Sequence, residues 1–228
     1  MELLVQLLLS LPVPHQQEAV FWFLPVIAVA ILFAGTVVIL FGDSYPDVKS
    51  FAIIGMQGAG KTQFLYNLRN KKYDEYEATL GIEEIGEFSF KLNNGKTITV
   101  KGCKDIPGGE EWIPEIYGKF IRDNEFLFFL FNSYKYVNNY KYRISVQARM
   151  EYVHRNYLNG KAKGVYVFAT FADQFKSKED RQKAITEIKS SVNGKTYAGL
   201  LSNFCLLDMR DKDELMKILS DKIFPNNE

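Results

Sequence analysis

Residues 51–62 read FAIIGMQGAGKT, and this stretch decides the fold. The apolar run 51–55 has the length of a buried strand, and a helix is expected over 61–70, where the glycines end. The pattern G-x-x-x-x-G-K-[ST] is matched by Gly55, Gly60, Lys61 and Thr62. A strand before and a helix after are the context that this pattern requires of a phosphate-binding loop. A chance glycine-rich turn would not be expected to meet all of these conditions.

The residue types in this loop predict how a phosphate group would be held. Glycines allow backbone N–H groups to surround phosphate oxygens, and the N-terminus of the following helix favours negative charge. Lys61 is expected to reach the β- and γ-phosphates and to assist catalysis, and the Thr62 hydroxyl is expected to coordinate Mg²⁺. The predicted nucleotide-binding residues of the loop are Gly55, Gln57, Gly58, Ala59, Gly60, Lys61, Thr62 and Gln63.

The rest of the chain alternates apolar strands with helices. Strands are predicted over 51–55, 84–91, 96–104, 125–131, 164–171 and 200–207, and helices over 61–70, 113–122, 140–158, 179–190 and 211–223. Asn93-Asn94-Gly95 separates the second and third strands and is a strong hairpin signal. Over 140–158, Ile144, Ala148 and Tyr152 recur at i+4, a spacing that indicates a helix. The order predicts an α/β fold with a mostly parallel six-stranded sheet and helices on both faces.

Charge is unevenly distributed along the 228 residues. The chain has 28 Lys+Arg against 27 Asp+Glu, and this near-zero balance gives no reason to expect a nucleic-acid partner. Residues 1–48 contain no Lys or Arg, so residues 49–228 carry 28 basic and 23 acidic residues, a net charge of +5.

Residues 19–42 form an uncharged stretch of 24 residues. A helix of that length is about 36 Å long and exceeds a hydrocarbon core of about 30 Å. A buried core helix would show a polar stripe, and a cleaved signal peptide would begin with basic residues, so a transmembrane helix is favoured. Because basic residues follow the span and none precedes it, the N-terminus is expected outside and the remainder in the cytoplasm. The predicted organisation is a tail or interfacial segment over 1–18, a span over 19–42, a linker over 43–50 and a domain over 51–228.

A second motif follows the predicted hairpin. Asp105 and Gly108 form D-x-x-G directly after the strand 96–104. The plain alternative is a Pro-Gly turn, but the motif and its position resemble the D-x-x-G of GTPases. That resemblance implies that the Asp contacts the metal through water and that the Gly N–H contacts the γ-phosphate. Thr79, 18 residues after Lys61, is expected to supply a second metal-binding hydroxyl. The predicted metal-binding residues are Thr62, Thr79 and Asp105.

With these motifs the chain resembles the Ras-like small GTPases, most closely the Arf branch and the beta subunit of the signal recognition particle receptor. Residues 79–81, Thr-Leu-Gly, resemble the T-I-G of Arf proteins, and residues 105–110, Asp-Ile-Pro-Gly-Gly-Glu, resemble the D-L-P-G-H-E of the receptor subunit. The resemblance covers roughly residues 49–224. It implies a P-loop G domain that binds GTP or GDP with Mg²⁺, placed behind an N-terminal span, with Lys61 and Gly108 in the catalytic centre.

Two positions depart from the family pattern. Where N-K-x-D reads guanine, this chain has residues 170–173, Thr-Phe-Ala-Asp. The resemblance still assigns Thr170 and Asp173 to base recognition; alternatively this is a strand end with a capping Asp. The water-orienting Gln is replaced by Gly109, which has no side chain, and Glu110 could substitute only in a remodelled loop. Hydrolysis is therefore expected to be slow or to need a partner protein.

The sequence as a whole predicts a membrane-anchored GTP-binding switch or docking platform at the cytoplasmic face of a bacterial inner membrane or the endoplasmic reticulum. A protein partner is expected to bind the two loops that contain Thr79 and Asp105–Gly108, which would act as switches that change shape with the bound nucleotide. The alternatives are a catalytically degenerate, nucleotide-bound scaffold or receptor subunit and, less favoured, a P-loop ATPase or kinase. The run 135–163 holds seven basic residues and one acid, so it is either a solvated helix face or a surface that rests on anionic lipid.

Overall fold

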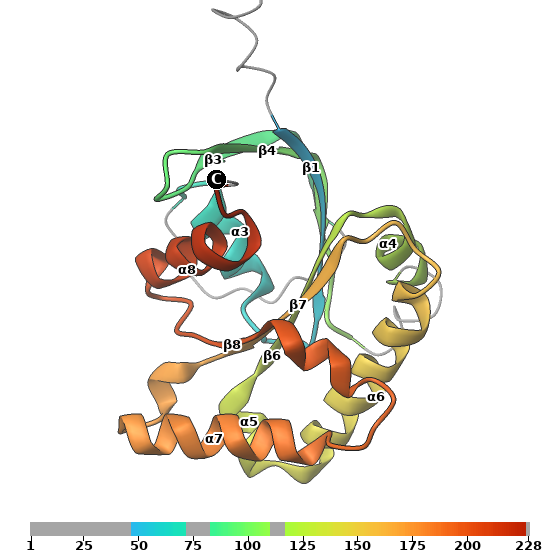
Figure 1. Cartoon of the computed structure of the whole chain (residues 1–228), viewed down its shortest axis with the longest axis vertical. Coiled ribbons are helices and arrows are strands. Elements are labelled where there is room, and N and C mark those ends of the chain that lie inside the picture. The colour runs from blue at the N-terminus through green and yellow to red at the C-terminus, as the bar shows by residue number, and fades with distance from the viewer. Residues whose placement is uncertain (1–46, 72–82, 110–116, 227–228) are drawn as a thin grey trace, which may run out of the picture. The chain divides into compact units, whose positions relative to one another are not determined.

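Six strands form one sheet in the order β3-β4-β1-β6-β7-β8 (Figure 1). The computed structural model describes residues 47–71, 83–109 and 117–226. The strands of this sheet are β1 (Asp47–Gly55), β3 (Phe88–Lys91), β4 (Thr97–Lys101), β6 (Phe126–Asn132), β7 (Gly164–Thr170) and β8 (Phe204–Leu206). Every neighbouring pair is parallel except β3 and β4. The predicted α/β fold with a mostly parallel sheet is confirmed.

The predicted hairpin joins β3 to β4. Leu92 N–H donates to the Lys96 carbonyl at 2.8 Å, and Gly95 has a φ of 87°, which suits the turn to glycine. A second pair of short strands, β2 (Glu83–Ile85) and β5 (Cys103–Asp105), is antiparallel. Along the chain, β2 precedes β3 and β5 follows β4. This arrangement places Asp105 beyond β4, at the edge where the parallel strands end.

Helices cover both faces of the sheet, as Figure 1 shows with α3 and α8 on one side and α4 and α6 on the other. The helices are α3 (Lys61–Leu68), α4 (Gly118–Asp123), α5 (Ser133–Asn138), α6 (Tyr140–Tyr157), α7 (Lys178–Ser191) and α8 (Lys212–Ile218), with a π turn, η5 (Leu219–Ile223), after α8. All seven residues of β6 are buried, because this strand lies inside the sheet and is covered on both faces. Phe64 of α3 packs on Phe128 and Phe168 with ring centroids 5.0 and 5.8 Å apart.

Several boundaries differ from the sequence prediction. β1 begins at Asp47 and not at residue 51, because 47–50 pair with β4; the last part of the predicted linker 43–50 is therefore strand. The predicted strand 200–207 is reduced to β8, preceded by the 3₁₀ helix η4 (Ala198–Asn203). The short helix α5 was not predicted; the Asn132 side chain caps it by accepting from Lys135 N–H at 2.8 Å.

The helix predicted over 140–158 is confirmed as α6, but the residues whose spacing indicated it are not the ones it buries. Ile144 is 45% exposed, whereas the buried residues of this helix are Val146, Arg149, Met150 and Val153. The buried stripe runs i, i+3, i+4, i+7 and includes an arginine, so the aliphatic pattern alone does not identify it. Among the described residues, no helix is both long and apolar enough to cross a membrane. The predicted tail over 1–18, the span over 19–42 and the linker up to residue 46 lie outside those residues.

Candidate functional site

The glycine-rich loop joins β1 to α3, as predicted, and its backbone needs glycine at both ends. Gly55 has a φ of 139°, and an added Cβ would lie 2.0 Å from the Leu130 carbonyl oxygen of β6. Gly60, immediately before α3, has a φ of 83°. Side chains rarely tolerate these φ values, so the two glycines allow a left-handed loop pressed against the sheet. Such a loop leaves backbone N–H groups at a helix N-terminus, where they suit an anion.

Lys61 is a buried cation within this loop. Its side chain is 6% exposed, and its Nζ donates to the Met56 carbonyl at 3.0 Å. Burial lowers the pKa of Lys61 from 10.5 to about 8; the nearby Asp105 carboxylate opposes this, and the Arg149 guanidinium adds to it. The ammonium group is thus costly to keep charged without an anion, as expected for a group that binds one.

Thr62 and Asp105 come together although 43 residues separate them. Thr62 Oγ1 donates to Asp105 Oδ2 at 2.7 Å, and Asp105 is 1% exposed. Two hard oxygen donors at this distance suit Mg²⁺, which uses one or two protein oxygens and takes its other ligands from water and phosphate. Across the described parts of the chain, no group of three or more His, Cys, Asp or Glu could hold a metal ion.

Gly108 lies against the glycine-rich loop. A Cβ added to it would fall 2.2 Å from the Gln57 backbone nitrogen, so only glycine allows this approach. The D-x-x-G loop and the phosphate-binding loop therefore meet backbone to backbone, as a shared phosphate ligand would require. Gly109 follows and presents no side chain, and Glu110 lies outside the described residues together with Thr79.

Thr170, at the end of β7, is attached to the phosphate-binding loop. Its side chain is fully buried, and Oγ1 lies 3.0 Å from the carbonyl oxygens of both Ala59 and Phe131, between which its one proton is shared. Thr170 thus holds the phosphate-binding loop against the end of β7. Its hydroxyl proton is already engaged and is not available to a nucleotide base. The next residue, Phe171, has a φ of 64°, an uncommon value for an aromatic residue that is typical of functional turns.

Asp173, the predicted base-reading carboxylate, is held by two neighbours. Its Oδ2 accepts from Gln174 Nε2 at 2.7 Å and lies 3.1 Å from Arg210 Nη2. The same guanidinium pairs with Asp208 at 2.8 Å and lowers the pKa of that carboxyl. Asp208 and Arg210 therefore form an ion-pair cluster with Asp173. Arg210 is 71% exposed, so a ligand could displace it at little cost.

Arg149 and Tyr117 belong to the site and were missed by sequence reasoning. Arg149 was assigned to a basic surface, but it is 4% exposed and its Nη1 donates to the Gly55 carbonyl at 2.9 Å. Tyr117 Oη lies 3.2 Å from the carbonyl oxygens of both Gly55 and Pro107. The available signal was an arginine within the stripe Val146, Met150, Val153.

The other predicted residues of the phosphate-binding loop differ in how far they are buried. Ala59 is buried in the loop, Gly58 is partly buried, and Gln57 is exposed. Gln63 points along its own helix, where its Nε2 donates to Asn67 Oδ1 at 3.0 Å, so the side chain does not face the loop. Asn67 in turn donates to the Met209 carbonyl at 2.8 Å and links α3 to the segment after β8.

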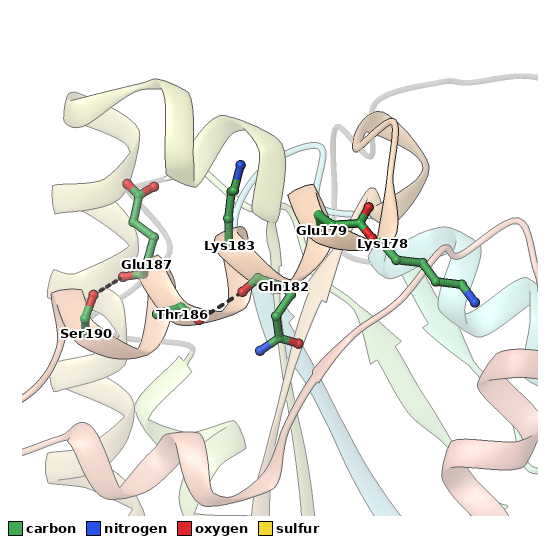
Figure 2. A pocket seen from close by; sticks show the side chains of 7 residues that line it. All are labelled: Lys178, Glu179, Gln182, Lys183, Thr186, Glu187 and Ser190. Atoms are coloured by element: carbon green, nitrogen blue, oxygen red, sulfur yellow. Dashed lines mark hydrogen bonds between the residues drawn. The ribbon is translucent and has the colours of Figure 1, made fainter.

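Hollows on the described surface differ in the residues that line them. One of about 770 Å³ lies along α7; Figure 2 shows that its seven lining side chains, Lys178 to Ser190, all come from that one helix. Two of them, Thr186 and Ser190, bond to carbonyl oxygens of α7 itself. An open surface of this kind lacks the convergent groups of a ligand site. A second hollow, of about 660 Å³, borders Arg210 and begins at Asp208.

The structure thus brings four separate segments to one edge of the sheet: the glycine-rich loop, the D-x-x-G loop, the end of β7 and the centre of α6. Lys61, Thr62, Asp105 and Gly108 meet there, whereas Asp173 lies with Arg210 beside them. No protein-family model matches the chain, and no curated protein matches it either.

Proposed function

We propose that this chain is a membrane-anchored GTP-binding protein of the small GTPase type. It would act as a nucleotide-dependent switch or docking platform at the cytoplasmic face of a membrane, with slow or partner-dependent hydrolysis. The observation that supports it is the meeting of the buried Lys61 ammonium, the Thr62 hydroxyl and the Asp105 carboxylate at a glycine-rich loop. This is the combination of groups that a Mg²⁺–triphosphate ligand needs.

The residues act on the phosphates and the metal in distinct ways. Lys61 exchanges the Met56 carbonyl for phosphate oxygens, and the ligand's charge offsets the burial that lowers its pKa. Thr62 would hold Mg²⁺ through its hydroxyl, and the Asp105 carboxylate, 2.7 Å away, would hold it directly or through water. When bound, the metal neutralises charge on the phosphate oxygens. The backbone of Gly108 closes against the loop on the side where the terminal phosphate is expected.

Slow hydrolysis follows from the absence of a side chain at Gly109. The step that a positioned glutamine would assist is the orientation of the attacking water, and glycine offers neither donor nor acceptor for it. A partner protein that inserts a polar side chain at this position would supply the missing group.

Base recognition rests on Asp173. Its carboxylate suits the N–H groups of guanine, but it must first exchange Arg210 and Gln174 for the base. Gly109 favours one alternative: a nucleotide-bound scaffold that hydrolyses its ligand little. The ATPase or kinase alternative has no comparable support in the described site.

A membrane anchor before residue 47 would hold the domain by the sheet edge where the parallel strands begin. The chain enters β1 at Asp47 on this edge, and Ser50 accepts from Glu125 N–H at 3.0 Å. Lys163 pairs with Glu125 at 2.7 Å, and the adjacent Leu158 is 67% exposed. The basic run 135–163 is therefore not one surface. Its two ends are separated by α6, about 27 Å long, and only the 158–163 end lies beside the start of β1.

Nucleotide titration of the full chain in lipid nanodiscs tests the proposal. With Mg²⁺, calorimetry should show GTP and GDP binding more tightly than ATP, and phosphate release should be slow. Lys61→Ala should abolish binding, whereas Lys183→Ala, on the exposed face of α7, should not change it. Preference for ATP would refute the guanine assignment. Rapid release of phosphate by the purified chain would refute the reasoning from Gly109.

A further inference from the structure

A buried cluster lies behind the glycine-rich loop and joins it to α6. The Gly55 carbonyl accepts from Arg149 Nη1 at 2.9 Å and lies 3.2 Å from Tyr117 Oη. Both side chains are almost fully buried, at 4% and 1% exposure. A buried guanidinium is retained only where it is hydrogen-bonded, and one of its partners is the first residue of the loop.

Tyr117 also reaches the D-x-x-G loop. Its Oη lies 3.2 Å from the Pro107 carbonyl, next to Gly108. A phenol has one proton, so Tyr117 donates to Gly55 or to Pro107 at any moment, but not to both. Burial raises the pKa of Tyr117, which keeps the phenol protonated and able to donate. The hydroxyl is therefore a switchable link between the two loops.

The helices on either side of this link are tightly packed. A Cβ added to Gly118 would lie 2.9 Å from Tyr152 Oη of α6, so α4 begins in direct contact with α6. Arg149 extends from the middle of α6 between Val146, Met150 and Val153. A displacement of the Pro107 carbonyl would thus alter the bonds on Gly55, and the change would reach α6 through Arg149.

We propose that Tyr117 and Arg149 are positioning residues that couple the D-x-x-G loop to the glycine-rich loop and to α6. This inference rests on the proposed function. When a terminal phosphate draws the Gly108 backbone inward, Pro107 moves relative to Gly55 and the Tyr117 proton changes its acceptor. The cluster thereby distinguishes triphosphate from diphosphate and transmits the difference to α6.

Two variants with matched controls test the coupling in the full chain in nanodiscs. Tyr117→Phe should lower the ratio of triphosphate-analogue affinity to GDP affinity about 3- to 10-fold, the effect of one lost hydrogen bond. Arg149→Lys should weaken both nucleotides about 10-fold and leave their ratio closer to that of the wild type. The controls are Tyr136→Phe and Arg143→Lys, because Tyr136 bonds Ser191 and Arg143 pairs with Glu187, away from the loop.

Hydrogen exchange supplies a readout that a purely structural role would not move. The triphosphate analogue should slow amide exchange in α6 more than GDP does in the wild-type chain, and Tyr117→Phe should remove that difference. If the wild-type chain binds no nucleotide, the proposed function itself fails. If it binds nucleotide and Tyr117→Phe gives the same affinity ratio and exchange pattern as Tyr136→Phe, the coupling is overturned and the proposed function stands.

Discussion

Replacing Lys61 by methionine should stabilise the ligand-free protein while it abolishes phosphate binding. The Lys61 side chain is 6% exposed, and burial lowers its pKa from 10.5 to about 8. At about 1.4 kcal/mol for each tenfold change in the protonation equilibrium, keeping this ammonium charged at pH 7 costs about 3 kcal/mol. Methionine has a similar length and no charge, so the substitution removes that cost.

A smaller loss offsets part of this gain. Lys61 Nζ donates to the Met56 carbonyl at 3.0 Å, and removing a buried donor costs about 1 kcal/mol. The expected net stabilisation at pH 7 is therefore about 2 kcal/mol. For a domain of this size it corresponds to a rise in Tm of about 4 to 8 °C.

The effect should also depend on pH in a defined direction. The pKa of Lys61 is lower in the folded than in the unfolded state, so between about 8 and 10.5 the unfolded chain binds the extra proton. Wild-type stability from this group is therefore lowest below pH 8 and rises as the pH increases through that window. The methionine variant lacks this rise, so its advantage should shrink by pH 10.

The assay is thermal unfolding of the full chain in nanodiscs, stripped of divalent ions and nucleotide by chelation and followed by circular dichroism at pH 7 and pH 10. Lys183→Met, an exposed lysine of α7, is the control and should shift the Tm at neither pH. A Lys61→Met variant less stable than wild type at pH 7 would refute the reasoning, as would an advantage equally large at pH 10.

Three further outcomes are expected. Gly108→Ala should destabilise the protein by about 2 kcal/mol or more, because the added Cβ would lie 2.2 Å from a backbone nitrogen; Gly199→Ala, with open space around it, is the control in the same melting experiment. Tyr142→Phe should remove part of the stability that the protein loses at alkaline pH. Burial raises the Tyr142 pKa to about 12, so the stability that this phenol contributes below pH 10 is lost as the pH rises through 12. Denaturant titrations at pH 8 and pH 11.5 would measure the difference in the free energy of unfolding. Arg210→Ala should raise GTP affinity up to about 5-fold by releasing the Asp173 carboxylate, whereas Asp173→Ala should lower it, as calorimetry would show.

Local patterns predicted the elements that carry the phosphate site. The run 51–55, the glycines and Lys61 act within a few residues of one another, so β1, the loop and α3 follow from propensity and backbone sterics alone. The same holds for the turn 93–95, where glycine adopts a φ of 87° and the hairpin forms as predicted. The order of strands and helices then restricts the sheet to a mostly parallel arrangement.

Contacts between distant residues could not be predicted in this way. Arg149 looked like one of seven surface cations, yet it is buried 94 residues from its acceptor, Gly55. Its burial depends on which face of α6 meets the sheet, and Ile144, which is 45% exposed, does not lie on that face. Similarly, Thr170 donates to the loop 111 residues away and Asp173 is held by Arg210.

Sequence alone therefore establishes a glycine-rich loop between strand and helix, because both elements form from neighbouring residues. Tertiary packing alone decides what surrounds that loop: a buried cation beneath Gly55, a tyrosine between two carbonyl groups, and a threonine hydroxyl bonded to the Ala59 carbonyl. Three of these contacts join residues 62 to 111 positions apart, and the fourth, between Tyr117 and Pro107, spans 10. Their energies arise only when the sheet assembles, so no local pattern encodes them.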